Sequence, residues 1–349
     1  MSGLATETPF PAAVTAPAPR VLDIQDLRTT IRMRSGDIAA VNGVSLHLAA
    51  SETLGIVGES GCGKSMTALS ILRLLPPVAR IAGGRVEFQG RDLVQLSPEE
   101  MRKVRGKDIS MIFQEPMTSL NPMMSIGRQI GEVLTLHEGV SSRDAMDRAV
   151  EMLRLVRIPE PERRVHEHPH QMSGGMRQRV MIAIALACNP KILLADEPTT
   201  ALDVTIQAQI MELMTDLQER LDTAVVLITH DLGLIAENAD RVVVMYAGKK
   251  VEEAAVSGLF EHPCHPYSLG LLGSIPRLGS SAMGAGRTRL TEIKGSVPAL
   301  SRMPKGCSFE PRCPFATQHC REQEPPLDEK LPGQWAACWH TDKVLAAGL

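Results

Sequence analysis

The chain has 349 residues, of which 37 are basic and 40 acidic, and 3% are aromatic. This length exceeds the roughly 250 to 300 residues over which one hydrophobic core usually grows, so two domains are expected. The balanced charge gives no general attraction to nucleic acid, and the lack of Trp or Tyr before Tyr246 disfavours a protein that stacks single-stranded bases. We therefore expect no nucleic-acid partner.

The start of the chain is rich in Pro, Ala and Thr, which predicts a disordered tail over residues 1–20. It has neither the basic start nor the apolar core of a signal peptide. The longest helical apolar run, VMIAIALAC over residues 180–188, is far shorter than the roughly 20 residues that cross a bilayer. We expect a cytoplasmic chain whose thiols stay reduced.

Short apolar runs alternate with helical stretches through the middle of the chain. The runs ETLGIVG, KILLAD and AVVLITH each end at a polar or glycine-rich corner, as buried parallel strands do. Apolar residues at three- and four-residue spacing predict a helical insertion over about 116–180. After about residue 263 the composition shifts to Pro, Gly and Cys. The sequence thus predicts an α/β main domain over residues 21–265 and a C-terminal extension over residues 266–349.

The first motif is GESGCGKS over residues 58–65, between an apolar strand and a helix. This pattern and context are typical of a phosphate-binding loop, whose glycines let backbone N–H groups face phosphate oxygens. The positive end of the following helix adds to the attraction. We expect Lys64 to reach the β- and γ-phosphates and Ser65 to ligate Mg²⁺. The predicted nucleotide contacts of this loop are Gly58, Glu59, Ser60, Gly61, Cys62, Gly63, Lys64, Ser65 and Met66.

A second motif, KILLADEPTT, ends an apolar strand in two carboxylates, Asp196 and Glu197. We expect Asp196 to hold the Mg²⁺ shell and Glu197 to polarise a water for in-line attack on the γ-phosphate. Alone, the pair is equally consistent with a solvated strand end. Together with the phosphate-binding loop, it predicts a nucleotide-hydrolysing site.

Further motifs follow in a fixed order, since FQEP, QMSGGMRQRV, ALD and ITH accompany the two motifs above. The complete set resembles the ATP-binding subunits of ABC transporters over about residues 21–260. This resemblance implies a P-loop fold with a RecA-like core, an antiparallel β subdomain and a helical subdomain over about 116–180. It also implies that the chain hydrolyses ATP with Mg²⁺.

The resemblance implies roles for single residues outside the phosphate-binding loop. Gln114 would complete the environment of the Mg²⁺ and the water and would sense the membrane partner. His230 would contact the γ-phosphate and support Glu197. Asp203 would communicate across a dimer of two such subunits.

The SGG stretch would present Ser173, Gly174 and Gly175 to the γ-phosphate of ATP held by the opposite subunit. The residue types suit this role physically, because Ser173 can cap a helix and the two glycines allow close approach to an anion. Because the stretch cannot serve its own phosphate-binding loop, this role requires dimerisation.

Two positions depart from the family pattern. The family commonly has LSGGQ where this chain has MSGGM, so Met176 replaces a polar side chain. The aromatic residue that stacks on adenine is missing, and the corresponding segment IRMRSGD offers Met33 and Arg34. We expect Arg34 to stack on the base.

The motifs with their flanks, such as FQEPMTSLNPMMSIGRQIGEVL and ADEPTTALDVTIQAQI, are similar to the dipeptide/oligopeptide importer branch, whose relatives include nickel and glutathione importers. The cysteine-bearing extension favours the peptide cargo, with nickel, glutathione or another small solute as the alternative. A soluble ABC ATPase acting on nucleic acid or ribosomes is the rival from another class. It would call for tandem ATPase units, a coiled-coil insertion or a basic arm, which the sequence does not show.

The same resemblance implies a set of partners at the cytoplasmic face of the inner membrane. These are two permease subunits, a second ATPase that is a paralogue or a second copy, and indirectly an external solute-binding protein. We expect Met117, Met123 and Met124 to form an adaptable groove for a permease helix, with core filling as the alternative. Exposure of these side chains separates the two hypotheses.

Four of the seven cysteines lie within residues 305–340. A reducing compartment disfavours disulfides, and the nucleotide chemistry is complete without a catalytic thiol. The Cys-x5-Cys-x6-Cys-x17-Cys spacing lacks the two-residue knuckles common in zinc sites, and four thiolates suit a [4Fe–4S] cluster. The resemblance to the peptide branch implies the same cluster. We expect it here, with Zn²⁺ or free thiols as alternatives and His319 and His340 as substitute ligands; the predicted ligands are Cys307, Cys313, Cys320 and Cys338.

Overall fold

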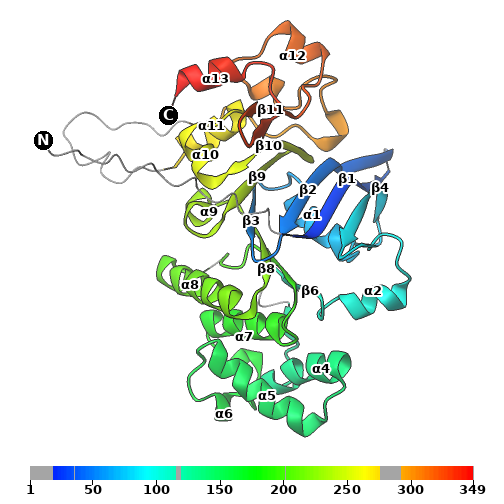
Figure 1. Cartoon of the computed structure of the whole chain (residues 1–349), viewed down its shortest axis with the longest axis vertical. Helices are drawn as coiled ribbons and strands as arrows, with labels where there is room; N and C mark the ends of the chain where they lie inside the picture. Colours follow the sequence, from blue (N-terminus) through cyan, green and yellow to red (C-terminus); the bar gives the residue numbers. More distant parts are fainter. Residues whose placement is uncertain (1–18, 35, 115–118, 201, 276–291, 349) are drawn as a thin grey trace, which may run out of the picture.

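The computed structural model describes residues 19–34, 36–114, 119–200, 202–275 and 292–348. Nearly all of the expected tail, and Met117 of the expected groove, lie outside these ranges. A group of helices occupies one end of the long axis, two sheets occupy the middle, and the C-terminal region occupies the other end (Figure 1).

The smaller sheet is antiparallel and consists of β1 (Arg20–Met33), β2 (Gly36–Ala49), β4 (Ala79–Phe88) and β5 (Arg91–Asp92). Its strand order is β2-β1-β4-β5. Leu22 and Ile24 of β1 are buried while Gln25 and Asp26 are exposed, which is the pattern of a sheet with one solvated face. This sheet is the antiparallel β subdomain that the resemblance implies.

The central sheet consists of β3 (Thr53–Val57), β6 (Ile109–Ile112), β7 (Ile192–Asp196), β8 (Ala224–Thr229), β9 (Arg241–Tyr246), β10 (Lys249–Ala255), β11 (Asp328–Leu331) and β12 (Gln334–Ala336). Its order is β11-β12-β10-β9-β3-β8-β7-β6. The five strands from β9 to β6 run parallel, and β3, β7 and β8 are buried along their whole length. The α/β prediction is therefore confirmed, because parallel strands covered on both faces have continuous apolar sequences.

The main-domain helices are α1 (Lys64–Ile71), α2 (Pro98–Val104), α4 (Ile126–Glu138), α5 (Ser142–Leu155), α6 (Pro161–Arg164), η1 (Pro169–Gln171), α7 (Gly174–Leu186), α8 (Val204–Leu221), α9 (Leu232–Asn238) and α10 (Val256–Glu261). The C-terminal region adds α11 (Pro266–Gly273), η2 (Leu300–Arg302), η3 (Glu310–Arg312), α12 (Gln318–Glu322) and α13 (Thr341–Ala347). Helices α4 to α7 gather at one end as a helical subdomain (Figure 1). Within the described ranges, no helix is both long and apolar enough to span a membrane.

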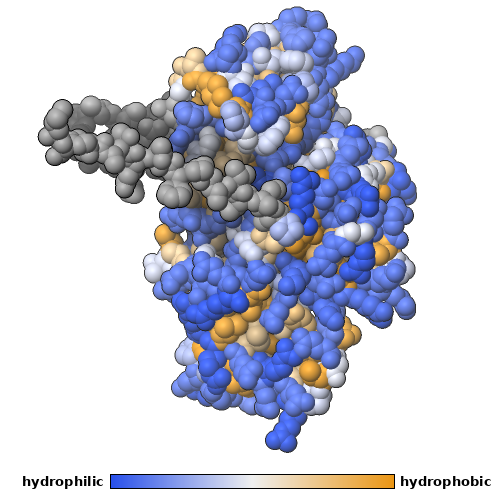
Figure 2. Space-filling view, viewed as in Figure 1, coloured by the Kyte–Doolittle hydropathy of each residue, from blue (hydrophilic) through white to orange (hydrophobic). Residues whose placement is uncertain are grey.

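The surface seen in Figure 2 is mostly hydrophilic, with separate apolar patches over the helical subdomain. Single exposed apolar side chains are ordinary on a folded protein. Met123, just before α4, is 83% exposed, and Leu136 of α4 is 65% exposed. The helical subdomain therefore presents apolar side chains to its surroundings.

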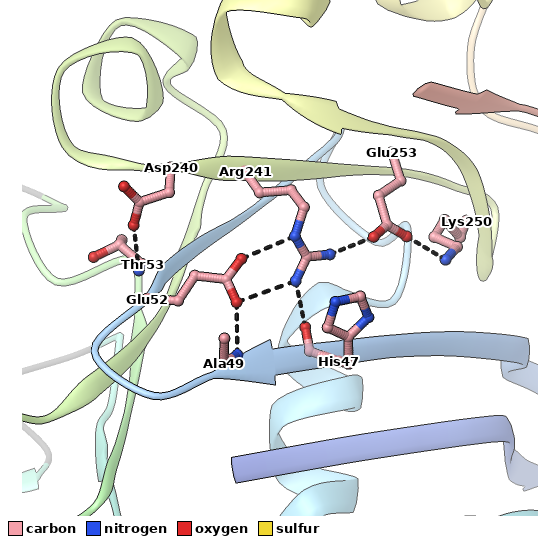
Figure 3. Close-up of polar contacts among 8 residues, drawn as sticks. All are labelled: His47, Ala49, Glu52, Thr53, Asp240, Arg241, Lys250 and Glu253. Atoms are coloured by element: carbon pink, nitrogen blue, oxygen red, sulfur yellow. Dashed lines mark hydrogen bonds and ion pairs between the residues drawn. The ribbon is translucent and has the colours of Figure 1, made fainter. Parts of the chain in front are cut away.

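An ion-pair network joins the two sheets at the amino ends of the central strands (Figure 3). Arg241 at the start of β9 donates to Glu52 Oε1 at 2.8 Å and to the His47 carbonyl at 2.6 Å, and it also pairs with Glu253 of β10. Lys250 pairs with the other oxygen of Glu253. Because His47 lies on β2, this network clamps the antiparallel sheet to the core.

The C-terminal region continues the central sheet, because β12 pairs antiparallel with β10. Glu252 of β10 is fully buried at this junction and accepts hydrogen bonds from the backbone N–H groups of Cys264 (2.7 Å) and His265 (2.9 Å). The Gln334 amide of β12 donates to the same carboxyl at 2.9 Å. Burial raises the pKa of Glu252. The extension predicted over residues 266–349 is thus integrated with the core through a buried polar junction.

Candidate functional site

The site is assembled at the carboxyl edge of the central sheet. The phosphate-binding loop follows β3, Asp196 ends β7 with Glu197 directly after it, and His230 follows β8. Adjacent parallel strands bring their carboxyl ends to the same edge, which is where open α/β sheets bind ligands. Motifs more than a hundred residues apart in sequence are therefore neighbours.

The loop geometry requires glycine at two of its positions. Gly58 has φ +151°, and a Cβ there would lie 2.2 Å from the Met245 carbonyl oxygen. Gly63 has φ +103°, and a Cβ there would lie 2.5 Å from the Ala40 carbonyl oxygen. Any side chain at either position would have to displace backbone, so the motif glycines are needed for the shape of the loop. Cys62, which is part of the loop, is fully buried.

Lys64 and Ser65 begin α1 directly after the loop. The Lys64 ammonium is buried and donates to the carbonyl oxygens of Gly58 at 2.7 Å and Glu59 at 3.2 Å. The Ser65 hydroxyl donates to Asp196 Oδ1 at 3.0 Å. The structure therefore brings together the hydroxyl and carboxylate predicted to hold Mg²⁺, and oxygen ligands of this kind suit that ion.

Glu197 accepts hydrogen bonds from two side chains and contacts a third. The Thr200 hydroxyl donates to Oε2 at 2.8 Å, the Gln114 amide donates to the same oxygen at 3.0 Å, and His230 Nδ1 lies 3.0 Å from Oε1. Glu197 itself has φ +47°, a strained backbone conformation for a residue with a side chain. The carboxylate is thereby fixed at the tip of the strand.

The two neighbouring carboxyls have opposite pKa shifts. Burial raises the pKa of Asp196, although the hydrogen bond from Ser65 partly offsets it. Burial also acts to raise the pKa of Glu197, but the hydrogen bond from Thr200, the contact with His230 and the positive charge of Lys64 together outweigh it and leave that pKa lowered. Glu197 is therefore ionised at neutral pH, as a general base must be.

The SGG stretch begins a helix, as its residue types predict. Ser173 is the N-cap of α7, and its hydroxyl accepts from the Met176 N–H at 3.3 Å. Gly175 faces Ile206 of α8, where an added Cβ would lie 3.0 Å from that side chain. Asp203 caps α8 by accepting from the Ile206 N–H at 2.9 Å. The SGG and ALD motifs thus lie against one another.

Among the described residues, no hydrogen bond joins Ser173 or Asp203 to the phosphate-binding loop. Met176 is partly buried and packs against the hydrophobic core that the helical subdomain shares with the central sheet. Met33 and Arg34 are exposed at the end of β1, so either side chain is accessible to a base.

Four residues of the site were missed by sequence reasoning. The Thr200 hydroxyl donates a hydrogen bond to Glu197. Because Thr200 lies three residues after Glu197 in the ADEPTT stretch, the sequence could have indicated this contact. Gln178 of α7 is buried and donates to the Pro198 carbonyl, linking the SGG helix to the catalytic strand end. Tyr267 and Arg312 reach the loop from the C-terminal region, and no sequence pattern points to them.

All seven cysteines are described, and each is free. Burial raises the pKa of Cys307 to about 11 and of Cys313 to about 12, with smaller contributions from the other thiols of the group. His340 borders the cavity that they share, whereas His319 packs against Trp339 with ring centroids 4.5 Å apart. The residues that line this small cavity include Cys307, Cys313, Cys320 and Cys338.

The donor set around this cavity fits a thiolate-bound group in its chemistry, because one buried thiol, that of Cys320, and three partly buried thiols line one space. The four thiols do not form a complete metal site as they are arranged in this structure. In the part of the chain that the structure describes, no group of three or more His, Cys, Asp or Glu side chains is arranged to hold a metal ion. The [4Fe–4S] cluster therefore stays a prediction.

Two family models match the chain. Residues 41–200 match the model described as ABC transporter, and residues 251–320 match the C-terminal region of oligopeptide/dipeptide transporters. The second match covers the junction between β10 and the cysteine-bearing region. The first match thus covers much of the main domain, and the second runs from β10 into the C-terminal region as far as Cys320.

Similar proteins span nearly the whole chain. A probable peptide ABC transporter ATP-binding protein of Sinorhizobium fredii is 56% identical over 93% of this chain and 96% of its own length. The oligopeptide transport ATP-binding protein OppD of Bacillus subtilis is 53% identical over 92% and 88%, and that of Salmonella typhimurium is 50% identical over 97% of both chains.

Two solved structures of ATP-binding cassettes are similar to this chain. A dimeric ATP-binding cassette in a post-hydrolysis state with ADP and phosphate superposes with a TM-score of 0.61, at 30% identity over 67% of this chain and 98% of that one. A dimeric bacterial ABC transporter cassette gives the same score at 31% identity. With its phosphate-binding loop, paired carboxylates and SGG helix in the expected places, the chain belongs to the ABC transporter family of ATP-binding proteins.

Proposed function

We propose that this chain is the ATP-hydrolysing subunit of a membrane transporter that imports di- and oligopeptides, and that it acts at the cytoplasmic face of the membrane. The observation that carries the ATPase part is the convergence of Ser65, Asp196 and Glu197 at one edge of the sheet. The peptide cargo is supported by relatives named as oligopeptide transport proteins and by the matching C-terminal region.

ATP binding uses the loop and the start of α1. Backbone N–H groups of the loop and the positive end of α1 face the phosphates, and Lys64 moves from its carbonyl partners to the phosphate oxygens. Ser65, Asp196 and Gln114 would hold Mg²⁺, which would supply positive charge to the β- and γ-phosphates. Arg34, exposed at the end of β1, stacks on the adenine.

Hydrolysis uses Glu197 as the general base. Its ionised carboxylate accepts the proton of a water aligned with the γ-phosphate. Thr200 and Gln114 fix the Oε2 atom by hydrogen bonds, so the base is held in one orientation. His230 is 65% exposed beside Oε1, which leaves its ring accessible to a γ-phosphate.

The working unit is a dimer of ATPase subunits. The N-terminus of α7, with Ser173 and the two following glycines, suits an anion but has no hydrogen bond to its own phosphate-binding loop within the described residues. It therefore serves the ATP of an opposite subunit, either a paralogue or a second copy of this chain, and Asp203 lies beside it to relay the contact.

The helical subdomain carries the surface for the permease subunits. A groove of about 660 Å³ lies between α4 and α5 and is lined by residues that include Met124, Gly131 and Met146. Met123 beside it is 83% exposed, which favours a docking role over core filling. An amphipathic permease helix fits such a groove. Closure of the ATPase dimer then moves that helix.

The cargo is tested by reconstitution. Vesicles containing the permease pair, both ATPase subunits and the solute-binding protein are expected to take up a labelled dipeptide or tetrapeptide only with ATP. Nickel or glutathione uptake in place of peptide uptake would contradict the peptide assignment while keeping the transporter. ATPase stimulation by ribosomes or nucleic acid, without permease, would favour the soluble class.

The four C-terminal thiols are the place for a [4Fe–4S] cluster in this proposal. They line one cavity, and four thiolates are the ligand set of such a cluster. Anaerobically purified chain is expected to contain four iron and four sulfide per protein and to absorb visible light. A colourless protein with one zinc would contradict the cluster and favour the zinc alternative.

A further inference from the structure

The C-terminal region reaches the phosphate-binding loop through one buried arginine. Arg312, at the end of η3, donates to both oxygens of Glu59, with Nη1 at 2.6 Å from Oε2 and Nη2 at 3.0 Å from Oε1. The two residues are 253 positions apart, and the Arg312 side chain is only 3% exposed. A two-bond arginine–carboxylate pair of this kind is both strong and directional.

The arginine is itself held rigidly. Its guanidinium also donates to the carbonyl oxygens of Lys294 (3.1 Å) and Ile293 (3.3 Å). It lies 5.8 Å from the Tyr246 ring centroid and 6.0 Å from that of Phe309, within reach of cation–π attraction. Because Tyr246 ends β9 and Phe309 belongs to the C-terminal region, Arg312 sits between the core and the extension.

The loop residue that it binds is held at three points. The Arg312 guanidinium holds the Glu59 carboxylate, the Tyr267 hydroxyl accepts from the Glu59 N–H at 2.8 Å, and Lys64 donates to the Glu59 carbonyl oxygen. Tyr267 lies on α11, so two of these three contacts come from the C-terminal region. The second position of the phosphate-binding loop is thus fixed from outside the main domain.

The charge of this pair also matters for an anionic ligand. Glu59 places a carboxylate in the loop that receives a triphosphate, and like charges at close range repel. Arg312 neutralises that carboxylate through its two hydrogen bonds to Glu59. Removing it would leave a partly buried, unpaired negative charge beside the nucleotide.

We infer that Arg312 is a positioning residue for the ATP site, which neutralises and orients Glu59 and so makes nucleotide affinity depend on the C-terminal region. This inference deepens the proposed function and rests on it. Arg312 immediately precedes Cys313, so loosening of the four-cysteine region is transmitted to the phosphate-binding loop by the shortest covalent route.

The test measures equilibrium binding of Mg·ATP, and the KM and kcat of hydrolysis, in the full-length chain. R312M retains apolar bulk against the two rings but removes the charge. It is expected to weaken ATP binding about tenfold, a usual size for coupling between linked sites, and to raise KM accordingly. Its kcat at saturating ATP is expected to stay near that of the unaltered chain, because Glu197 and its partners are untouched.

Second-site rescue separates this role from a structural one. E59Q in the R312M background removes the unpaired carboxylate, so the double variant is expected to bind ATP more tightly than R312M alone. R312K, which keeps the charge but not the two-bond fork, should fall between R312M and the unaltered chain. R321M is the matched control, since Arg321 pairs with Glu310 in the same region without touching the loop.

Two results would overturn the inference. One is ATP binding by R312M equal to that of the unaltered chain. The other is equal weakness of R312M and the double variant with E59Q, which would mean that Arg312 does not act by neutralising Glu59. If R312M does not fold, R312K takes its place, and ATP binding is compared between R312K alone and R312K combined with E59Q. Absence of ATP binding in the unaltered chain would overturn the proposed function itself, whereas the first two results would leave it standing.

Discussion

The two ends of the central sheet carry similar ion pairs with different neighbours. At the amino ends of the strands, Arg241 joins Glu52 and Glu253 (Figure 3). Beyond the carboxyl end of β3, Arg312 joins Glu59. Both arginines are largely buried, but the partners of Arg241 belong to strands and their turns, whereas the partner of Arg312 belongs to the phosphate-binding loop. Similar chemistry thus stabilises the fold at one end and shapes a ligand site at the other.

The difference follows from what each end of a parallel strand can offer. The amino ends meet the antiparallel sheet and need a clamp, which Arg241 supplies through Glu52 and the His47 carbonyl. The carboxyl ends open into loops whose backbone N–H groups are available to a ligand. Variants at the amino ends should therefore change stability, and variants at the carboxyl ends should change ATP binding. A variant that changes both would contradict this division.

The largest effect on stability is expected at the amino end. R241M leaves Glu52 and Glu253 without their shared partner in a largely buried position, which should lower the free energy of unfolding by about 3 kcal/mol. Chemical denaturation measures this change, and ATP binding to the remaining folded protein is expected to be unaltered. Weakened ATP binding at unchanged stability would contradict the division between the two ends.

The largest effect on binding is expected at Lys64. K64A removes the ammonium that serves the phosphates, and hydrogen bonds to charged groups contribute about 1.5 to 3 kcal/mol, so ATP should bind about 10- to 100-fold more weakly. Equilibrium dialysis with labelled ATP measures this. K103A, at an exposed position of α2, is the control and should bind as the unaltered chain does. Equal binding by K64A would place the phosphates elsewhere.

A smaller effect with a defined pH signature is expected at Thr200. T200V removes the hydroxyl that helps to lower the pKa of Glu197, so that pKa should rise. Because the base must be ionised, the acid limb of the kcat profile should move to higher pH. At neutral pH Glu197 stays ionised but loses one orienting hydrogen bond, so kcat there should fall about fivefold, the value of one ordinary hydrogen bond. A profile that stays in place would argue against Glu197 as the base.

The smallest effect on the isolated chain is expected at Met123. M123E changes a side chain that is 83% exposed, so its stability should change by less than about 0.5 kcal/mol. Intrinsic ATP hydrolysis should also be unchanged, while co-purification with the permease pair should fall. Retained permease binding would show that the groove beside Met123 is not the docking surface.

Local patterns were enough to predict the α/β class and much of the site. The residues from Gly58 to Ser65 form one contiguous loop, and Asp196 and Glu197 lie together at a strand end, so spacing alone placed them. The helix cap at Ser173 followed from residue type. The resemblance supplied what spacing could not, namely the implied roles of Gln114 and His230, which the structure places beside Glu197.

Contacts across large sequence separations were not predictable in this way. Arg312 lies in a region with little periodicity, and nothing near it signals an ion pair with Glu59. The same region supplies β12, whose three residues are too few for an alternating pattern. This strand is held in the sheet partly by the hydrogen bond that Gln334 donates to the buried Glu252. Such partners are determined by tertiary packing, which local sequence patterns do not record.

The role of Glu197 as the catalytic base is tested most directly by E197Q, assayed for both ATP binding and turnover. Glutamine has nearly the same shape but cannot accept the proton of the attacking water. E197Q is expected to bind Mg·ATP as the unaltered chain does and to hydrolyse it roughly 10² to 10⁴ fold more slowly, the usual contribution of acid–base assistance. Turnover equal to that of the unaltered chain would contradict the claim that the chemistry is carried by Glu197 at the carboxyl edge of the sheet.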